Sequence, residues 1–298
     1  RPRGPFPVDR QKALAKELMT GIGFDFDHGR LDESTHPFCG GTPSDIRITT
    51  RYDENETVSA LMGVLHETGH ALYEAGLPEL WRGQPVGTSH GMAIHESQSL
   101  IIEMQACRSP AFLRYLAARL TDTFGPQPAL APENLIRLYT HVEKGLIRVD
   151  ADELTYPLHI VLRYRLEKAL IKGDLDLQDL PAAWNDTMRE LLGITPPTDR
   201  EGCLQDIHWP VGAFGYFPNY TLGALLAAQL FQAAERIIPD LLSAIGQGDF
   251  APLRQWLRAN VHEKASSLPM QGLIEAATGR ELGTDAFLAH VEGRYGRG

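Results

Sequence analysis

An apolar stripe between residues 58 and 72 places the strongest constraint on the fold. Its members are Val58, Leu61, Met62, Leu65 and Leu72. They recur at intervals of three, four and seven residues, the spacing that places side chains on one face of an α-helix. Gly76 and Pro78 follow, and residues of these types end helices. The segment therefore predicts a helix over about 58–75 that is buried along one side.

Helical periodicity also dominates the rest of the chain. Further helices are predicted from about residue 93 towards 110 and at 110–123, 132–147, 152–172, 181–192, 220–237, 251–262 and 284–294. The exception is 45–52, where polar and β-branched residues alternate as in a strand. The patterns predict a mostly α fold with a small sheet edge beside the first long helix. No change in composition marks a boundary, so a single domain over 1–298 is expected.

Composition excludes several classes of partner and compartment. The formal net charge is −10, which argues against binding to nucleic acid or to an anionic membrane. The longest apolar stretch, 222–231, is interrupted by Gln229 and is too short to span a bilayer. Cys39, Cys107 and Cys203 are far apart and odd in number. They argue against a disulfide scaffold and fit a reducing, cytoplasmic compartment.

His66, Glu67 and His70 form an H-E-x-x-H motif inside the first predicted helix. The two histidines lie about one turn apart on the same face, so both imidazoles can converge on one metal ion. Glu67 lies about 100° around the helix and can reach a water at that ion. Zn²⁺ lowers the pKa of such a water towards roughly 7, and a carboxylate can then take its proton. The alternative is a polar helix face without a metal, but the adjacent apolar stripe disfavours it.

A catalytic zinc site needs a third protein ligand and one open position. Glu96 is the candidate, in the segment His95–Gln98 at the start of the next predicted helix, and His95 is its rival. Neighbouring helical residues point about 100° apart, so only one of the two is expected to bind the metal. Glu74, one turn beyond the H-E-x-x-H motif, and Glu103 could each accept the ring N–H of a ligand histidine. An ordinary exposed helix carboxylate is the alternative for Glu74.

Five short motifs follow one another between residues 45 and 209. They are D-x-R-x-T at Asp45–Thr49, H-E-x-x-H at His66–His70, H-E-S-Q at His95–Gln98, I-R-x-x-A-D at Ile147–Asp152 and G-x-x-Q-D-x-H-W at Gly202–Trp209. This ordered set resembles the motifs of the thermostable (Taq-type) metallocarboxypeptidase family. Five ordered motifs are a much more specific signal than H-E-x-x-H alone.

The resemblance implies a helical zincin-like (neurolysin-like) fold, a homodimer and the release of C-terminal residues from peptides with broad specificity. It also implies that His66, His70 and Glu96 are the metal ligands and that Glu67 is the general base. Family members are considerably longer on the N-terminal side. The chain is therefore expected to be an N-terminally short member or a fragment without the helices that cover the substrate groove, and its opening residues do not read as a secretory leader.

The predicted loop at 196–220 is rich in glycine, proline and aromatic residues and lacks periodicity, which is common in functional loops. His208, Tyr216 and Tyr220 are its candidate donors to the tetrahedral oxyanion of peptide hydrolysis. Packing within the loop is the alternative for each tyrosine. Asp206 is expected to fix the tautomer of His208 so that the imidazole donates towards the substrate.

A carboxypeptidase must also bind the free carboxylate of its substrate, and arginine does so with two parallel charge-assisted hydrogen bonds. Arg148 and Arg47 are the candidates, and Asp206 joins them in the predicted substrate-binding set. An ion pair with a neighbouring aspartate is the alternative for each arginine. The strand at 45–51 is expected to form a groove edge that holds extended peptides through backbone hydrogen bonds.

The ligand types also indicate which metal ions the site can bind. Zn²⁺ suits a two-histidine, one-glutamate site, and Co²⁺ or Mn²⁺ are possible substitutes. The substrate is expected to be a peptide. Two alternatives stay open at this stage, namely an oligopeptide endopeptidase and a truncated relative that binds metal without catalysis. Glu167, Lys168 and Lys172 are expected to form a solvated helix face.

Overall fold

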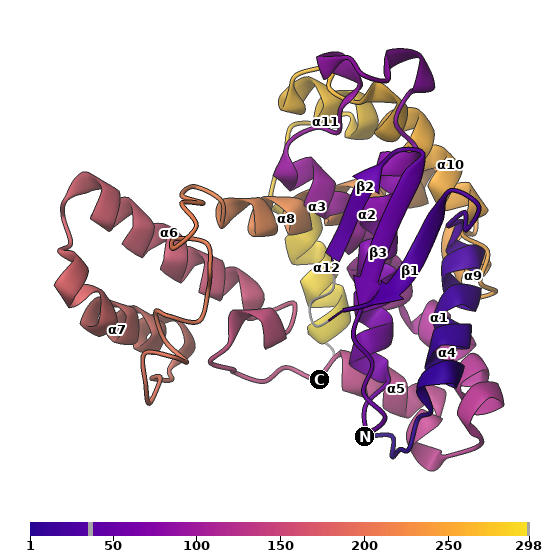
Figure 1. Cartoon of the computed structure of the whole chain (residues 1–298), viewed down its shortest axis with the longest axis horizontal. Helices are drawn as coiled ribbons and strands as arrows, with labels where there is room; N and C mark the ends of the chain where they lie inside the picture. The colour runs from indigo at the N-terminus through magenta and orange to yellow at the C-terminus, as the bar shows by residue number, and fades with distance from the viewer. Residues whose placement is uncertain (35–37, 297–298) are drawn as a thin grey trace. The chain divides into compact units, whose positions relative to one another are not determined.

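The computed structural model describes residues 1–34 and 38–296 and is mostly α-helical with one small sheet (Figure 1), as predicted. By its internal contacts the chain divides into two compact units. Unit 1 comprises Arg1–Thr140 and Gly223–Gly298, and unit 2 comprises His141–Leu222. The single catalytic domain over 1–298 stays a prediction.

The sheet of unit 1 lies against the helix that carries H-E-x-x-H. Its strands are β1 (Gly29–Glu33), β2 (Phe38–Thr42) and β3 (Asp45–Thr50). Ile46 and Ile48 of β3 are buried, whereas Arg47 between them is exposed. Because alternate strand residues face opposite sides of a sheet, the isoleucine face packs towards α2 (Val58–Ala75). Figure 1 shows the sheet lying along this helix.

The strand order corrects one prediction. The order is β1-β3-β2, with β1 parallel and β2 antiparallel to β3. Since β3 is paired on both sides, the segment 45–51 cannot offer a free edge to an extended peptide. The alternating pattern identified the strand correctly, but it carries no information about its place in the sheet.

Unit 1 is otherwise built from helices around one large apolar core. They are α1 (Val8–Ile22), α2, α3 (Met92–Leu100), the π-helix η3 (Ile101–Cys107), α4 (Pro110–Phe124), α5 (Pro132–Tyr139), α9 (Leu241–Ile245), α10 (Ala251–Asn260), α11 (Met270–Thr278), α12 (Asp285–Tyr295) and the greater part of α8 (Pro218–Ile237). Helices α1, α9 and α11 were not predicted, although in α1 Leu14, Leu18 and Ile22 recur every four residues and are buried. Helix α5 ends at Tyr139 rather than at 147, and the residues that follow are largely exposed.

Unit 2 contains two consecutive helices, α6 (Tyr156–Lys172) and α7 (Leu180–Leu192), that pack on each other. Their shared core includes Leu166, Trp184 and Met188. Helix α6 starts later than predicted because the Asp152 carboxylate accepts hydrogen bonds from the backbone N–H groups of Leu154 and Thr155 in a preceding turn. Residues 196–217 form turns, as predicted for the aromatic loop. Within the described residues, every helix falls short of the length and apolar character needed to cross a bilayer.

Candidate metal centre and a second polar network

Helix α2 presents the two motif histidines side by side. The ring centroids of His66 and His70 lie 5.0 Å apart, and both side chains are partly shielded from solvent. The apolar stripe of the same helix, which includes Leu61 and Leu65, is fully buried. The stripe therefore fixes the rotation of α2, and that rotation sets the direction in which both imidazoles project.

Two glycines make room for the predicted third ligand. A Cβ atom at Gly69 would clash with the backbone oxygen of Gln98, so α2 and α3 approach closely between the two histidines. A Cβ atom at Gly223 of α8 would lie 2.7 Å from Cγ of Glu96. Both positions tolerate only glycine without a shift of neighbouring atoms. The close approach brings Glu96 of α3 up to the α2 histidines.

The donor atoms of His66, His70 and Glu96 converge. Oε2 of Glu96 is 3.5 Å from Nε2 of His70 and 3.9 Å from Nε2 of His66. One ligand atom from each residue lies within 4.8 Å of the others. A tetrahedral zinc with bonds of about 2.0–2.1 Å holds its ligand atoms roughly 3.3 Å apart. The three residues therefore fit a single ion after movements of a few tenths of an ångström to an ångström, and they leave a position open for water or substrate.

The rival ligand, His95, turns to other partners. Its Nδ1 lies 2.7 Å from Nδ1 of His70, and its Nε2 lies 2.9 Å from Oε1 of Glu74. Glu74 was expected to contact a ligand histidine directly, so that prediction is wrong, because the imidazole of His95 lies between the two. Burial raises the pKa of Glu74, but the hydrogen bonds from His95 and Ser89 outweigh it and hold the pKa below its ordinary value.

Glu103 supports the other histidine, as predicted. Its Oε2 lies 2.9 Å from Nδ1 of His66, and its Oε1 accepts a hydrogen bond of 2.5 Å from Nη2 of Arg108. Burial opposes ionisation of Glu103, but Arg108 and His66 lower its pKa to about 2. Glu103 lies in the π-helix η3, a geometry that often occurs at functional sites.

Glu67 is 9% exposed and lies within electrostatic reach of His66 and Glu96. Burial is the main cause that raises the pKa of its carboxyl group above the ordinary value, and Glu96 adds to it. A carboxylate with a raised pKa is a stronger base than an exposed one. This environment suits proton transfer close to the three converging donors.

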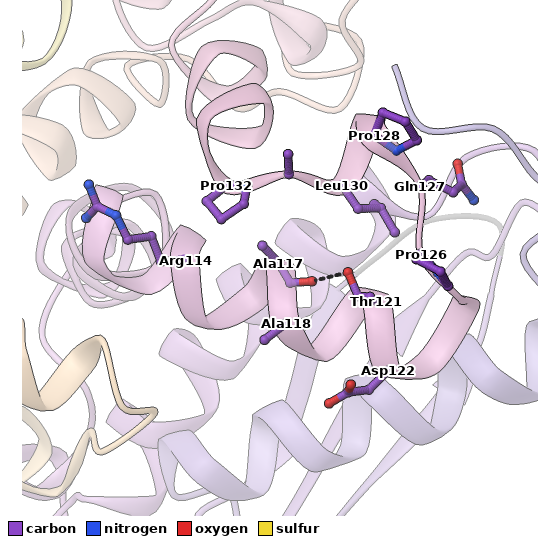
Figure 2. Close-up of a pocket in the computed structure, with 11 residues that line it drawn as sticks. Arg114, Ala117, Ala118, Thr121, Asp122, Pro126, Gln127, Pro128, Leu130 and Pro132 are labelled. Carbon is purple, nitrogen blue, oxygen red and sulfur yellow. Dashed lines mark hydrogen bonds between the residues drawn. The ribbon is translucent and has the colours of Figure 1, made fainter.

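A surface pocket lies in another part of unit 1. Figure 2 shows that it lies along α4 and the proline-rich segment after it, with a volume of about 630 Å³. It is lined by Arg114, Ala117, Ala118, Thr121, Asp122, Pro126, Gln127, Pro128, Leu130, Ala131 and Pro132. None of these eleven residues belongs to the predicted site, so the pocket is not part of the candidate metal centre.

Unit 2 contains a separate buried network around Asp206. Its Oδ1 accepts hydrogen bonds from Nε and Nη2 of Arg148, at 3.0 and 2.7 Å, and its Oδ2 accepts one from Nε of Arg163 at 2.6 Å. Nη1 of Arg148 also donates to the Tyr156 hydroxyl at 2.5 Å. Burial raises the pKa of Asp206, but the two guanidinium groups outweigh it and lower the pKa. Arg148 is thus held by an aspartate, although by one distant in the sequence.

Two members of this network, Arg163 and Gln205, were not predicted from the sequence. Arg163 is fully buried on α6, and Gln205 accepts hydrogen bonds from the backbone N–H of Arg148 and from Nη2 of Arg163. The amide of Gln205 donates in turn to backbone carbonyl groups, including that of Leu146. The sequence offers no clear signal for the burial of Arg163, since Arg165 also lies between Leu162 and Leu166 and is exposed.

The three candidate oxyanion donors cluster in unit 2. Nε2 of His208 lies 3.0 Å from the Tyr220 hydroxyl, and the Tyr216 ring lies 5.3 Å from the His208 ring. Asp206 does not hold this imidazole, because its Oδ1 is 3.8 Å from Nδ1 of His208, beyond hydrogen-bond distance. The expected tautomer-fixing role of Asp206 is therefore wrong, since both of its oxygens serve the arginines.

Arg47 and Glu167 lie in environments that differ from those predicted for them. Arg47 lies on the exposed face of the sheet, where it pairs with Asp45 at 2.8 Å, so the structure favours the ion-pair alternative. Glu167 is buried rather than solvated, and it accepts hydrogen bonds from Trp209 Nε1 and from the backbone N–H of Gly215, each at 2.6 Å. Glu167 thus ties the aromatic loop to α6, whereas Lys168 is exposed as expected.

Comparisons with known proteins agree with the geometry of the metal centre. Residues 2–295 match the model of the carboxypeptidase Taq (M32) metallopeptidase family. Thermostable carboxypeptidase 1 of Thermus thermophilus is 42% identical over 292 residues, which cover 98% of this chain and 57% of that protein. Carboxypeptidase 1 of Bacillus subtilis is 40% identical, and 58% of its length is covered.

Solved structures give the same result. Metallocarboxypeptidase 1 of Trypanosoma cruzi matches with a TM-score of 0.96 and 45% identity, over 99% of this chain and 62% of that one. The M32 carboxypeptidase of Deinococcus radiodurans matches with a TM-score of 0.95 and 40% identity, over 99% of this chain and 60% of that one. The chain thus spans 57–62% of the length of these relatives. On this evidence the chain belongs to the carboxypeptidase Taq (M32) metallopeptidase family.

Proposed function

We propose that this chain carries the metal centre of a zinc-dependent carboxypeptidase that releases C-terminal residues from peptides with broad specificity. The observation that carries the proposal is the convergence of His66, His70 and Glu96 beside the buried carboxyl group of Glu67. Two imidazoles and one carboxylate with an open position are typical of catalytic rather than structural zinc sites. Co²⁺ or Mn²⁺ could bind the same donors.

The proposed reaction is hydrolysis with general base catalysis. Zinc bound at this site would polarise the scissile carbonyl and make water acidic enough to be deprotonated near neutral pH. Glu67 takes the proton of the attacking water, and the same carboxyl group delivers it to the leaving amine. Its burial supports this role, because a raised pKa brings the carboxyl group closer to the pH at which both transfers occur.

Substrate recognition is assigned to unit 2 and to one edge of the sheet. His208, Tyr216 and Tyr220 are proposed to donate to the oxyanion, and Arg148, oriented by Asp206, to bind the substrate carboxylate. The edge strand β2, in place of 45–51, is proposed to hold extended peptides through backbone hydrogen bonds. Strand β2 lies beside α2. Burial of Cys39 in this strand, together with the charges of Glu67 and Glu74, raises the pKa of the Cys39 thiol to about 12.

The state of the protein in the cell forms the last part of the proposal. We expect a cytoplasmic homodimer that acts on peptides and does not bind nucleic acid. The net charge of −10 supports the last of these expectations, because it disfavours contact with a phosphate backbone.

The test is mass spectrometry of a defined peptide mixture after incubation with the zinc-loaded protein and with its Glu67→Gln variant. Stepwise loss of C-terminal residues is expected for the wild type, with a loss of about 10²–10⁴-fold in rate for the variant at unchanged zinc content. A fully active Glu67→Gln protein would falsify the role of the base.

A second set of peptides separates the rival functions. Peptides with an amidated C-terminus lack the carboxylate that the proposed arginine binds, so they should resist cleavage. Equal cleavage of amidated and free-acid peptides would instead identify an endopeptidase. Normal zinc content without hydrolysis of any peptide would identify a metal-binding relative that lacks catalysis.

A further inference from the structure

The two ligand histidines are held in different ways on the side away from Glu96. Nδ1 of His66 faces the carboxylate of Glu103, at 2.9 Å. Nδ1 of His70 faces no carboxylate directly and instead meets Nδ1 of His95, at 2.7 Å. Two identical ring nitrogens at that distance need one proton between them, so one must donate and the other must accept.

Glu74 decides the direction of that hydrogen bond. An ionised carboxylate can only accept, so Nε2 of His95, 2.9 Å from Oε1 of Glu74, must carry a proton. Neutral His95 then has a lone pair on Nδ1, and the proton between the rings belongs to His70 Nδ1. The other nitrogen of His70, Nε2, is left with a lone pair. That atom is the one that lies 3.5 Å from Glu96, within the group of converging donors.

The fold places the three groups in line. Positions 66, 70 and 74 are four residues apart on α2 and share one face of the helix. His95 enters from α3 between His70 and Glu74, and its ring lies 4.6 Å from the His70 ring. The Tyr73 ring packs against His95 at 5.4 Å, which limits its rotation. The arrangement therefore has a defined direction, from Glu74 through His95 to His70.

We propose that Glu74 and His95 are positioning residues that hold His70 in its Nδ1–H tautomer, so that its Nε2 is free to bind the metal. This inference rests on the proposed metal centre and assigns a role to the histidine of H-E-S-Q, whose neighbour Glu96 is the ligand. Neither residue touches the metal or the substrate in this account. Groups that orient a metal-bound histidine typically contribute about 10–100-fold to metal affinity.

Zinc affinity tests the inference without any measurement of activity. The dissociation constant is obtained by competition with a chromophoric chelator, for the wild type and for His95→Phe, Glu74→Met and Glu74→Gln. His95→Phe and Glu74→Met should weaken zinc binding by about 10–100-fold. Glu74→Gln keeps an acceptor oxygen and should recover much of the loss. Glu79→Met, which removes an exposed glutamate of the same unit, is the matched control and should bind zinc as the wild type does.

The tautomers provide a readout that a merely structural role would not produce. Long-range ¹H–¹⁵N spectra of zinc-loaded protein with ¹⁵N-labelled histidine should show His95 protonated on Nε2 and His70 protonated on Nδ1. A His95 protonated on Nδ1 would overturn the inference, as would zinc binding by His95→Phe that equals that of the wild type. If the wild type binds no zinc, the proposed metal centre itself fails and the inference fails with it.

Discussion

The two buried polar networks of this protein have opposite charge. In unit 1 the carboxylates of Glu74, Glu96 and Glu103 surround the histidines, and Arg108 pairs with Glu103. In unit 2 a single aspartate serves two arginines. Buried charge must be balanced to be tolerated. The first network therefore favours an added cation, whereas the second retains positive charge that suits an anion such as the carboxylate of a peptide.

The largest effect on stability is expected from Asp206→Asn in unit 2. Loss of one partner from a buried, hydrogen-bonded ion pair typically costs about 3–5 kcal/mol, because the opposite charge is left without compensation. Here both Arg148 and Arg163 would lose their shared partner. Denaturant unfolding of wild type and variant at pH 7 measures the difference, and a loss below about 1 kcal/mol would contradict the account.

The pH dependence of unfolding gives an independent check on the same residue. The pKa of folded Asp206 lies below its ordinary value, so its contribution to stability is fully present above the unfolded pKa of about 3.9. The contribution is lost as the pH falls through the lower folded value. The difference in unfolding free energy between Asp206→Asn and the wild type should therefore shrink as the pH falls below about 3.9, and a constant difference across the whole pH range would speak against this origin.

Added zinc should stabilise the protein through unit 1. A ligand that binds only the folded state at 100 times its dissociation constant adds about 2.7 kcal/mol. The shift in midpoint temperature should be clear for the wild type and much smaller for Glu96→Gln, which weakens one of the three proposed ligands. Equal stabilisation of both proteins would mean that zinc binds elsewhere.

Gly69→Ala tests how closely the two helices of the metal centre must approach. The new methyl group would meet the backbone of Gln98 and Ser99, so the helices must separate. Overpacking of this kind typically lowers the free energy of unfolding by about 1–3 kcal/mol, and here it should also weaken zinc binding. Gly63→Ala on the same helix is the matched control, because nothing lies within 4 Å of its Cβ position. Alanine there should stabilise the helix by up to about 1 kcal/mol.

The smallest effect is expected on the exposed face of the sheet. Asp45 and Arg47 form an ion pair in which both side chains are more than half exposed to solvent. Such pairs contribute little because water and salt screen them. Arg47→Gln should leave the unfolding midpoint unchanged, in contrast to Asp206→Asn. A shift in the unfolding midpoint as large as that of Asp206→Asn would show that the exposed pair is linked to other parts of unit 1.

Most helices and the core of the metal centre could be predicted from the sequence, because both depend on local spacing. His66 and His70 are one turn apart in a helix whose apolar stripe is visible in the sequence, and the five ordered motifs identified the family. The strand at 45–50 was also recognised from its alternation. Its central place in the sheet was not, since β1 and β2 have weak patterns and pairing depends on distant segments.

The supporting residues were harder to predict for the same reason. The contact between Glu74 and His95 joins two helices, and spacing along one helix suggested instead that Glu74 would reach His70 directly. Arg163 and Gln205 meet Asp206 only because three distant segments of unit 2 fold together. Glu167 was grouped with Lys168 and Lys172 as a solvated helix face, whereas its partners lie in the loop more than 40 residues away.

A crystal structure of the protein with zinc, with anomalous diffraction recorded on both sides of the zinc absorption edge, tests the central claim most directly. The account predicts one strong anomalous peak within about 2.0–2.2 Å of Nε2 of His66, Nε2 of His70 and Oε2 of Glu96. It also predicts that His95 remains between His70 and Glu74. A peak bound by His95 in place of Glu96, or no peak among these residues, would contradict it.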